Sequence, residues 1–174
     1  MEIKKVTPIR QILAIALVVC TLFCFVVTAH ALSIEDNNDA WIWPTEGKEI
    51  TMTFGKHTHP ITGAVHNYDH IYIKGENGDS VLAAIDGTVT KTGYDTKYGY
   101  YIVVSDNNGI NTVYGQLKEI LVESGAEVVA GAKIGTLGNT GNVVGNCLSF
   151  AVFEGKTAVD PMDYLKQRQK PINF

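Results

Sequence analysis

The chain has 174 residues, a formal net charge of −4 and 45% hydrophobic residues. This length suits one domain with an adequate core, and the acidic balance leaves no basic patch that would indicate nucleic-acid binding. Two of its three cysteines lie in an apolar N-terminal run, so a disulfide framework is not expected.

Residues 1–31 have the layout of an export signal. Three basic residues among the first ten precede an apolar run over residues 12–27, and Ala29-His30-Ala31 supplies a small-x-small cleavage motif. The alternative is a retained membrane anchor, although the run is shorter than the about 20 residues that span a bilayer. Both interpretations place the remainder outside the cytoplasm, secreted or anchored at the cell envelope, with membrane contact only if the segment stays uncleaved.

The exported part is expected to be one domain. It carries eleven basic and seventeen acidic residues, a formal charge of −6, and keeps a single cysteine, Cys147, so no internal disulfide is possible. Residues 32–40 are polar and acidic and predict a linker. The domain is predicted over residues 41–168, followed by a tail over residues 169–174.

Short strands and tight turns follow from Trp41 onward. Trp41 and Trp43 are two positions apart, so on an extended strand they point the same way and cover one flank of the core. Strands are predicted over residues 49–54, 70–74, 80–85, 88–92, 100–105, 110–117, 127–129, 133–137 and 148–153.

Turn and helix signals complete the pattern. Asp86-Gly87 predicts a hairpin turn, and residues 118–121 predict one helical turn. Pro161 at a first helical position predicts a helix over residues 161–169. About ten short strands at regular spacing predict an all-β fold with a mostly antiparallel sheet core and a short C-terminal helix.

Four of the five histidines, His57, His59, His66 and His70, lie between Phe54 and Ile73. Imidazole is the side chain that most often binds a transition metal or transfers a proton near neutral pH, so this stretch predicts a site. His57 and His59 adjoin a proline turn and are interpreted as surface or turn histidines rather than ligands.

Seven phrases carry a family resemblance. They are W-P at residues 43–44, F-G-x-x-x-H-P-I-T-G at 54–63, A-A-x-D-G-T-V at 83–89, Y-G-Y-Y-I-V-V at 98–104, V-Y-G-Q-L at 113–117, V-x-x-G-x-x-I-G-x-x-G-N-T-G at 128–141 and D-P-x-x-Y-L at 160–165. In this order they resemble the lysostaphin and LytM-type family of zinc endopeptidases, which cut peptidoglycan cross-bridges. The resemblance implies a β core of the duplicated-hybrid-motif type, with a groove over one sheet face.

The resemblance also implies three zinc ligands and two catalytic histidines. The ligand positions, His, Asp and His in the family, fall on His66, His70 and Ser149. The two catalytic histidines fall on Gln116 and Cys147. Glutamine cannot take up a proton at neutral pH and serine is a poor zinc ligand, so catalytic residues and bound zinc are not expected.

Zinc remains expected under one alternative. His66, His70 and Cys147 supply two imidazoles and a thiolate, and Cys147 shares its strand face with Ser149. The alternative interpretation is therefore an active zinc metalloendopeptidase that acts on peptidoglycan with these altered ligands. Asp69 stands one residue before His70 and would point to the opposite face of a strand.

The favoured interpretation is an exported, non-catalytic regulator or scaffold that binds peptidoglycan or an envelope protein. Its groove is predicted to include Tyr68, which replaces a glycine of the family motif, together with Gln116, Cys147 and Ser149. A third interpretation is a purely structural module that binds a membrane partner through a sheet face or edge strand.

Overall fold

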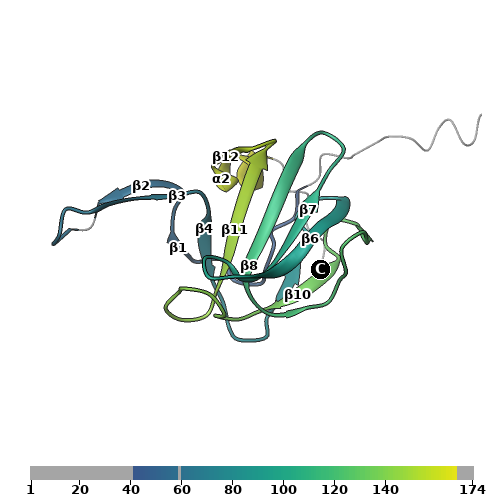
Figure 1. Ribbon diagram of the computed structural model, residues 1–174, viewed down its shortest axis with the longest axis horizontal. Coiled ribbons are helices and arrows are strands. Elements are labelled where there is room, and N and C mark those ends of the chain that lie inside the picture. The colour runs from purple at the N-terminus through teal and green to yellow at the C-terminus, as the bar shows by residue number, and fades with distance from the viewer. Residues whose placement is uncertain (1–40, 59, 168–174) are drawn as a thin grey trace, which may run out of the picture. The chain divides into compact units, whose positions relative to one another are not determined.

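The structure is a computed structural model that describes residues 41–58 and 60–167 (Figure 1). The predicted signal or anchor, the linker and the C-terminal tail lie outside the described residues, as does His59. Among the helices of the described part, none has the length and apolar character needed to cross a membrane.

Two antiparallel sheets make up the domain, one of ten strands and one of two. The ten-stranded sheet contains β1 (Ile50–Met52), β4 (Ile71–Lys74), β5 (Ser80–Leu82), β6 (Gly87–Asp95), β7 (Gly99–Ser105), β8 (Ile110–Ile120), β9 (Glu127–Val128), β10 (Lys133–Leu137), β11 (Cys147–Glu154) and β12 (Thr157–Val159). Its main path runs β1-β4-β11-β8-β7-β6-β9, while β10 pairs with β5 and β8, and β12 pairs with β11. The two-stranded sheet is the hairpin of β2 (Gly55–Thr58) and β3 (Val65–Tyr68). The predicted all-β, mostly antiparallel fold is confirmed.

Strand β11 lies between β4 and β8 and separates the core from the groove. In its register Phe150 pairs with Ile71 and Tyr114, and all three side chains are fully buried. Because side chains alternate along a strand, Cys147 and Ser149 point to the opposite face of the sheet. The same strand therefore supports the hydrophobic core and forms the floor of the groove.

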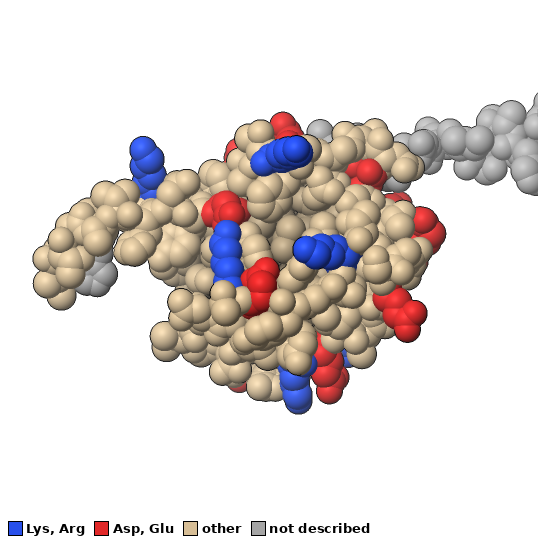
Figure 2. Space-filling view, in the orientation of Figure 1, with Lys and Arg blue, Asp and Glu red and all other residues tan. Residues whose placement is uncertain are grey.

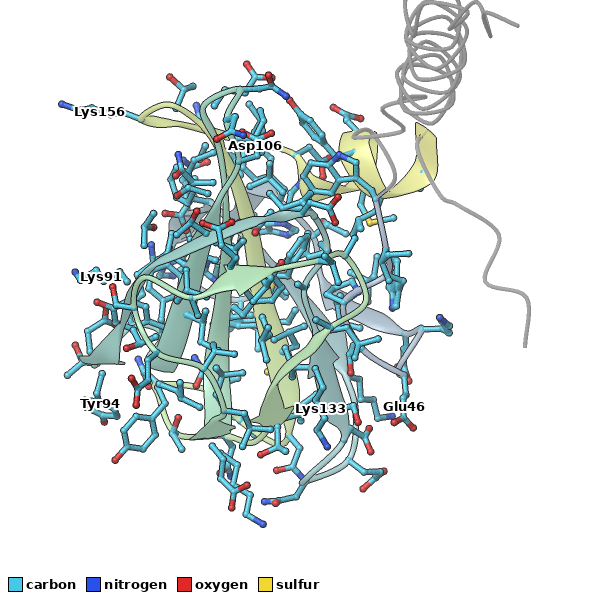
Figure 3. All side chains as sticks on the ribbon, turned by 90° about the vertical axis from the view of Figure 1, so that its right-hand side faces the viewer. Glu46, Lys91, Tyr94, Asp106, Lys133 and Lys156 are labelled. Atoms are coloured by element: carbon cyan, nitrogen blue, oxygen red, sulfur yellow. The ribbon has the colours of Figure 1, made fainter. Side chains whose placement is uncertain are left out.

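The two ends of the described domain meet at the core. Trp41 and Trp43 are both buried, as expected for residues on one flank. The ring of Trp41 packs 4.6 Å, centroid to centroid, from Tyr164 on helix α2 (Pro161–Gln167). Figure 3 shows the charged side chain of Lys156 directed away from the sheets.

Two local predictions were wrong. Residues 118–121 do not form a helical turn, because β8 continues to Ile120, which pairs with Gly135 of β10. Asp86-Gly87 does not join a hairpin either, since β5 pairs with β10, and β6, which begins at Gly87, pairs with β7 and β9. In both places a distant strand supplies hydrogen bonds that outweigh the local preference.

The β2–β3 hairpin was not predicted as a pair of strands. It extends away from the ten-stranded sheet (Figure 1). Its residues are half-buried or exposed on both faces, so the alternation of apolar and polar residues that indicates a strand is weak.

Candidate binding groove

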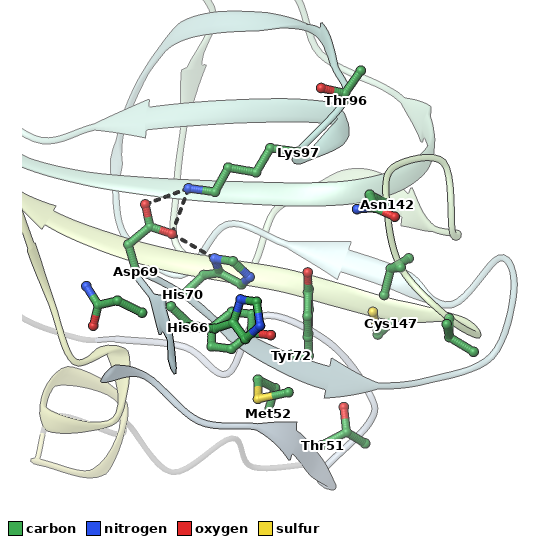
Figure 4. Close-up of a pocket in the computed structure, with 14 residues that line it drawn as sticks. Thr51, Met52, His66, Asp69, His70, Tyr72, Thr96, Lys97, Asn142 and Cys147 are labelled. Atoms are coloured by element: carbon green, nitrogen blue, oxygen red, sulfur yellow. Dashed lines mark hydrogen bonds and ion pairs between the residues drawn. The ribbon is translucent and has the colours of Figure 1, made fainter. Parts of the chain in front are cut away.

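A pocket of about 870 Å³ opens over the outer face of the sheet beside the β2–β3 hairpin. Its walls come from β1, from β3 and the start of β4, from the turn between β6 and β7, and from the segment before β11. The lining residues are Thr51, Met52, His66, Asn67, Tyr68, Asp69, His70, Tyr72, Thr96, Lys97, Asn142, Val143, Val144 and Cys147 (Figure 4). On the face seen in Figure 2, acidic and basic side chains are interspersed, with no patch of a single sign.

A charged cluster forms one wall of this groove. The Asp69 carboxylate accepts two hydrogen bonds from the Lys97 ammonium, at 2.6 and 2.8 Å. It also accepts one at 2.8 Å from His70 Nδ1 (Figure 4). A further one comes from the Tyr98 hydroxyl at 3.3 Å. The prediction that Asp69 points away from His70 was wrong, because both residues lie in a bend before β4, where strand alternation does not apply.

The hydrogen bond to Asp69 fixes the tautomer of His70. A carboxylate accepts, so Nδ1 carries the proton and Nε2 presents a lone pair. Nε2 is buried and has no hydrogen-bond partner among the described residues. Burial lowers the pKa of His70 and outweighs the opposing effect of Asp69. Burial alone would raise the pKa of Asp69, but hydrogen bonds from Lys97 and His70 outweigh it, so that pKa is lowered.

Acid should therefore destabilise the domain in two steps. The pKa of His70 in the folded protein is below its ordinary value of 6.5. Neutral His70 therefore makes its whole contribution to the free energy of unfolding above pH 6.5, and that contribution is lost as the pH falls from 6.5 toward the lowered pKa. The lowered pKa of Asp69 gives a second loss below its ordinary value of 3.8. Each step is bounded by about 1.4 kcal/mol per pH unit. Urea unfolding at a series of pH values tests this, and His70→Gln should flatten the first step; equal stability of the wild type at pH 7 and 5 would contradict it.

Gln116 lies beneath the groove wall and does not line the pocket. Its side chain is fully buried, with Nε2 donating to the Lys97 carbonyl at 3.0 Å and Oε1 accepting from Gly141 N at 2.6 Å. Its backbone N–H donates to the Tyr98 carbonyl at 2.5 Å. The side chain thus joins the β6–β7 turn to the segment at residue 141, and both ends of its amide are occupied.

Cys147 and Ser149 face the groove side of the sheet, as the register predicts. Cys147 lines the pocket but is only 5% exposed, and burial raises the pKa of its thiol to about 11, so it is neutral at physiological pH. Ser149 is 1% exposed, and within residues 41–58 and 60–167 its hydroxyl has no hydrogen-bond partner.

His66 and Tyr68 reach the same pocket from β3. The ring of Tyr68 lies 5.6 Å from that of His70 and 6.4 Å from that of His66. His70 also contacts Tyr72 at 4.8 Å and Tyr98 at 5.9 Å. The predicted site residues His66, Tyr68, His70 and Cys147 therefore share one aromatic-lined groove.

The residues present do not fit a three-ligand zinc centre. Across residues 41–58 and 60–167, no three His, Cys, Asp or Glu side chains come close enough together to hold a metal ion. The alternative set of His66, His70 and Cys147 is thus not gathered around one point. The remaining family position, Ser149, offers only a neutral hydroxyl.

Sequence reasoning missed the contribution of Lys97 and Tyr98. They lie in the turn between β6 and β7, about thirty residues from Asp69, and no metal-ligand or catalytic pattern marks them. A charged residue in a turn ordinarily indicates only solvent exposure.

Comparison with known proteins identifies sequences that resemble this chain. The model of peptidase family M23 matches residues 66–161. The chain is 37% identical over 130 residues to the murein hydrolase activator NlpD of Escherichia coli K12, a match covering 74% of this chain and 32% of NlpD. The chain therefore spans about a third of the length of this relative.

Solved structures show the same fold. A zinc-containing peptidase from Vibrio cholerae superposes with a TM-score of 0.67 at 32% identity, covering 71% of this chain and 39% of that one. The catalytic domain of lysostaphin from Staphylococcus simulans gives a TM-score of 0.61 at 27% identity, covering 68% of this chain and 92% of that domain.

Proposed function

The chain belongs to peptidase family M23. We propose that it is an M23 domain without peptidase activity, which acts as a regulator or scaffold at the cell envelope. In this role it binds peptidoglycan or an envelope protein through the groove over its sheet. Zinc at the family ligand positions is not required for this function.

The observation that carries the proposal is the role of Gln116. The position corresponds to a catalytic histidine of the family, yet its amide is buried and bound at both ends. A glutamine side chain does not exchange a proton at neutral pH, so no group at this point serves as general acid or base. Cys147, at the second catalytic position, is neutral because burial raises the pKa of its thiol to about 11.

The groove itself supports a binding role. Tyr68, Tyr72 and two histidines surround it, and aromatic rings with polar edges suit a wet concave site that holds a sugar or peptide. The similarity to a murein hydrolase activator supports action on another wall enzyme. Murein lies outside the cytoplasmic membrane, which agrees with the expected export by residues 1–31.

The chain should bind purified peptidoglycan sacculi without releasing soluble fragments, with or without added zinc. Tyr72→Ala should weaken co-sedimentation about tenfold, which corresponds to ~1.4 kcal/mol for a lost aromatic contact. Tyr94→Ala is the matched control, because Tyr94 is 57% exposed, points outward and lies outside the pocket (Figure 3). If the partner is instead a wall hydrolase, the chain should raise that enzyme's activity, and Tyr72→Ala should remove the effect.

One result would overturn the proposal in favour of an active metalloendopeptidase. It is zinc-dependent cleavage of sacculi by the wild-type chain that His66→Ala abolishes. Circular dichroism of each variant shows whether its fold is intact.

A further inference from the structure

Two histidines stand directly opposite one another on the β2–β3 hairpin. In the antiparallel register His57 pairs with His66, so their side chains leave the same face of the ribbon. Directly opposed residues have Cβ atoms about 4.5–5.5 Å apart. Two imidazoles at this separation can direct one nitrogen each to a common point, since a transition-metal–nitrogen bond is about 2.0–2.1 Å long.

The hydrogen bonding of His57 prepares it as a ligand. Its Nε2 lies 2.7 Å from the backbone carbonyl oxygen of Thr53. A carbonyl only accepts, so Nε2 carries the proton and Nδ1 presents its lone pair. Histidines that bind metals commonly donate their other ring N–H to a carbonyl or carboxylate, which fixes both tautomer and orientation.

The partner imidazole is accessible. His66 is exposed, and its ring makes no hydrogen bond to another described residue, so a cation need not displace one. Tyr68 stands opposite Gly55 in the next pair on the same face, and its ring lies 5.5 Å from His57 and 6.4 Å from His66. Both imidazoles thus flank one aromatic ring.

We propose that His57 and His66 form a two-imidazole site for a divalent transition-metal cation of the zinc, nickel or copper class. Imidazole nitrogens suit these metals. Two protein ligands leave the other coordination positions to water or to a donor from a bound partner. The site differs from the family's ligand set, because it uses His57 and needs neither His70 nor Ser149, and it does not depend on the proposed wall-binding function.

The test is a calorimetric titration of the chain with zinc chloride alone. The wild type should bind one equivalent of zinc. His57→Ala and His66→Ala should each lower the zinc affinity at least tenfold, a change of about 1.4 kcal/mol. Thr58→Ala is the matched control, since Thr58 occupies the neighbouring pair with Val65 and should leave binding unchanged. Thermal unfolding of each metal-free variant confirms that the hairpin substitutions leave the domain folded.

Variants that move one histidine along its strand test whether zinc binding needs both imidazoles on the same face of the hairpin, rather than only two histidines in the hairpin. His66→Ala combined with Asn67→His keeps the number of imidazoles but moves one to the opposite face, so the zinc equivalent should be lost. Lys56 pairs with Asn67, so Lys56→His with Asn67→His, added to His57→Ala and His66→Ala, should restore binding on the other face.

Three outcomes would overturn the proposal. One is a titration in which the wild type binds no zinc, or binds zinc no more tightly than His57→Ala does. The second is binding that survives His57→Ala but is lost in His66→Ala and His70→Asn, which would place the metal at the family centre and count against the proposed function too. The third is zinc binding that persists when one imidazole is moved to the opposite face.

Discussion

Replacing Gln116 with alanine should lower the free energy of unfolding by about 3 kcal/mol, since the change leaves buried polar groups unpaired. The amide is the hydrogen-bond partner of the Lys97 carbonyl and of Gly141 N–H, and the side chain is fully buried. Its removal also leaves a cavity, which adds to the cost. Urea unfolding followed by tryptophan fluorescence, with Trp41 and Trp43 as buried probes, measures the difference.

A glycine variant provides the matched control. Gln116 is the one non-glycine residue of the described chain with a positive φ, 65°, a conformation that costs an L-residue about 1 kcal/mol and glycine almost nothing. Gln116→Gly loses the same hydrogen bonds but removes this strain, so it should be about 1 kcal/mol more stable than Gln116→Ala. Elsewhere in a strand glycine is the less stable choice. A Gln116→Ala variant within 1 kcal/mol of wild type would contradict this account of the side chain.

Replacing Phe150 with alanine should cost about 3–5 kcal/mol of unfolding free energy, the range for large aromatic residues in a packed core. Phe150 is fully buried, its ring lies 5.4 Å from that of Tyr114, and it pairs with Ile71 across the strands. Because it lies on the core face of β11 between Cys147 and the end of the strand, the loss should also loosen the groove floor. Denaturant unfolding measures the first effect, and hydrogen exchange at the amides of β4 and β11 measures the second.

Phe150→Leu is the control for this site. It keeps most of the apolar volume, so it should cost less than about 1.5 kcal/mol and leave exchange in β4 unchanged. Equal losses for the leucine and alanine variants would indicate that ring shape, rather than buried volume, determines the stability of the core.

Much of the fold was predictable because its strands carry strong local signals. Residues 100–105 and 148–153 combine β-branched and aromatic residues with bounding turns, and the structure contains β7 and β11 there. The β2–β3 hairpin carries no such signal, since it buries little on either face. The end of β8 was misread because its pairing with Gly135 depends on a strand that comes later in the chain.

The site was predictable only in part, for a related reason. The family resemblance identified His66, His70 and Cys147, which share the groove. It could not show that Gln116 lies beneath the wall as a structural link, because that role depends on the positions of Lys97 and Gly141. The Asp69–Lys97 pair depends in the same way on a bend before β4 and on the β6–β7 turn, which meet only in the folded chain.

The position of β11 affects how the domain is completed during synthesis. Strand β4 ends at residue 74 and needs β11, which ends at residue 154, as its second neighbour, while β8 needs the same strand on its other side. Until β11 has left the ribosome, β4 and β8 each keep an open edge. The central pairing of the sheet therefore forms late and joins residues far apart in the sequence, which slows folding relative to a domain built from local contacts.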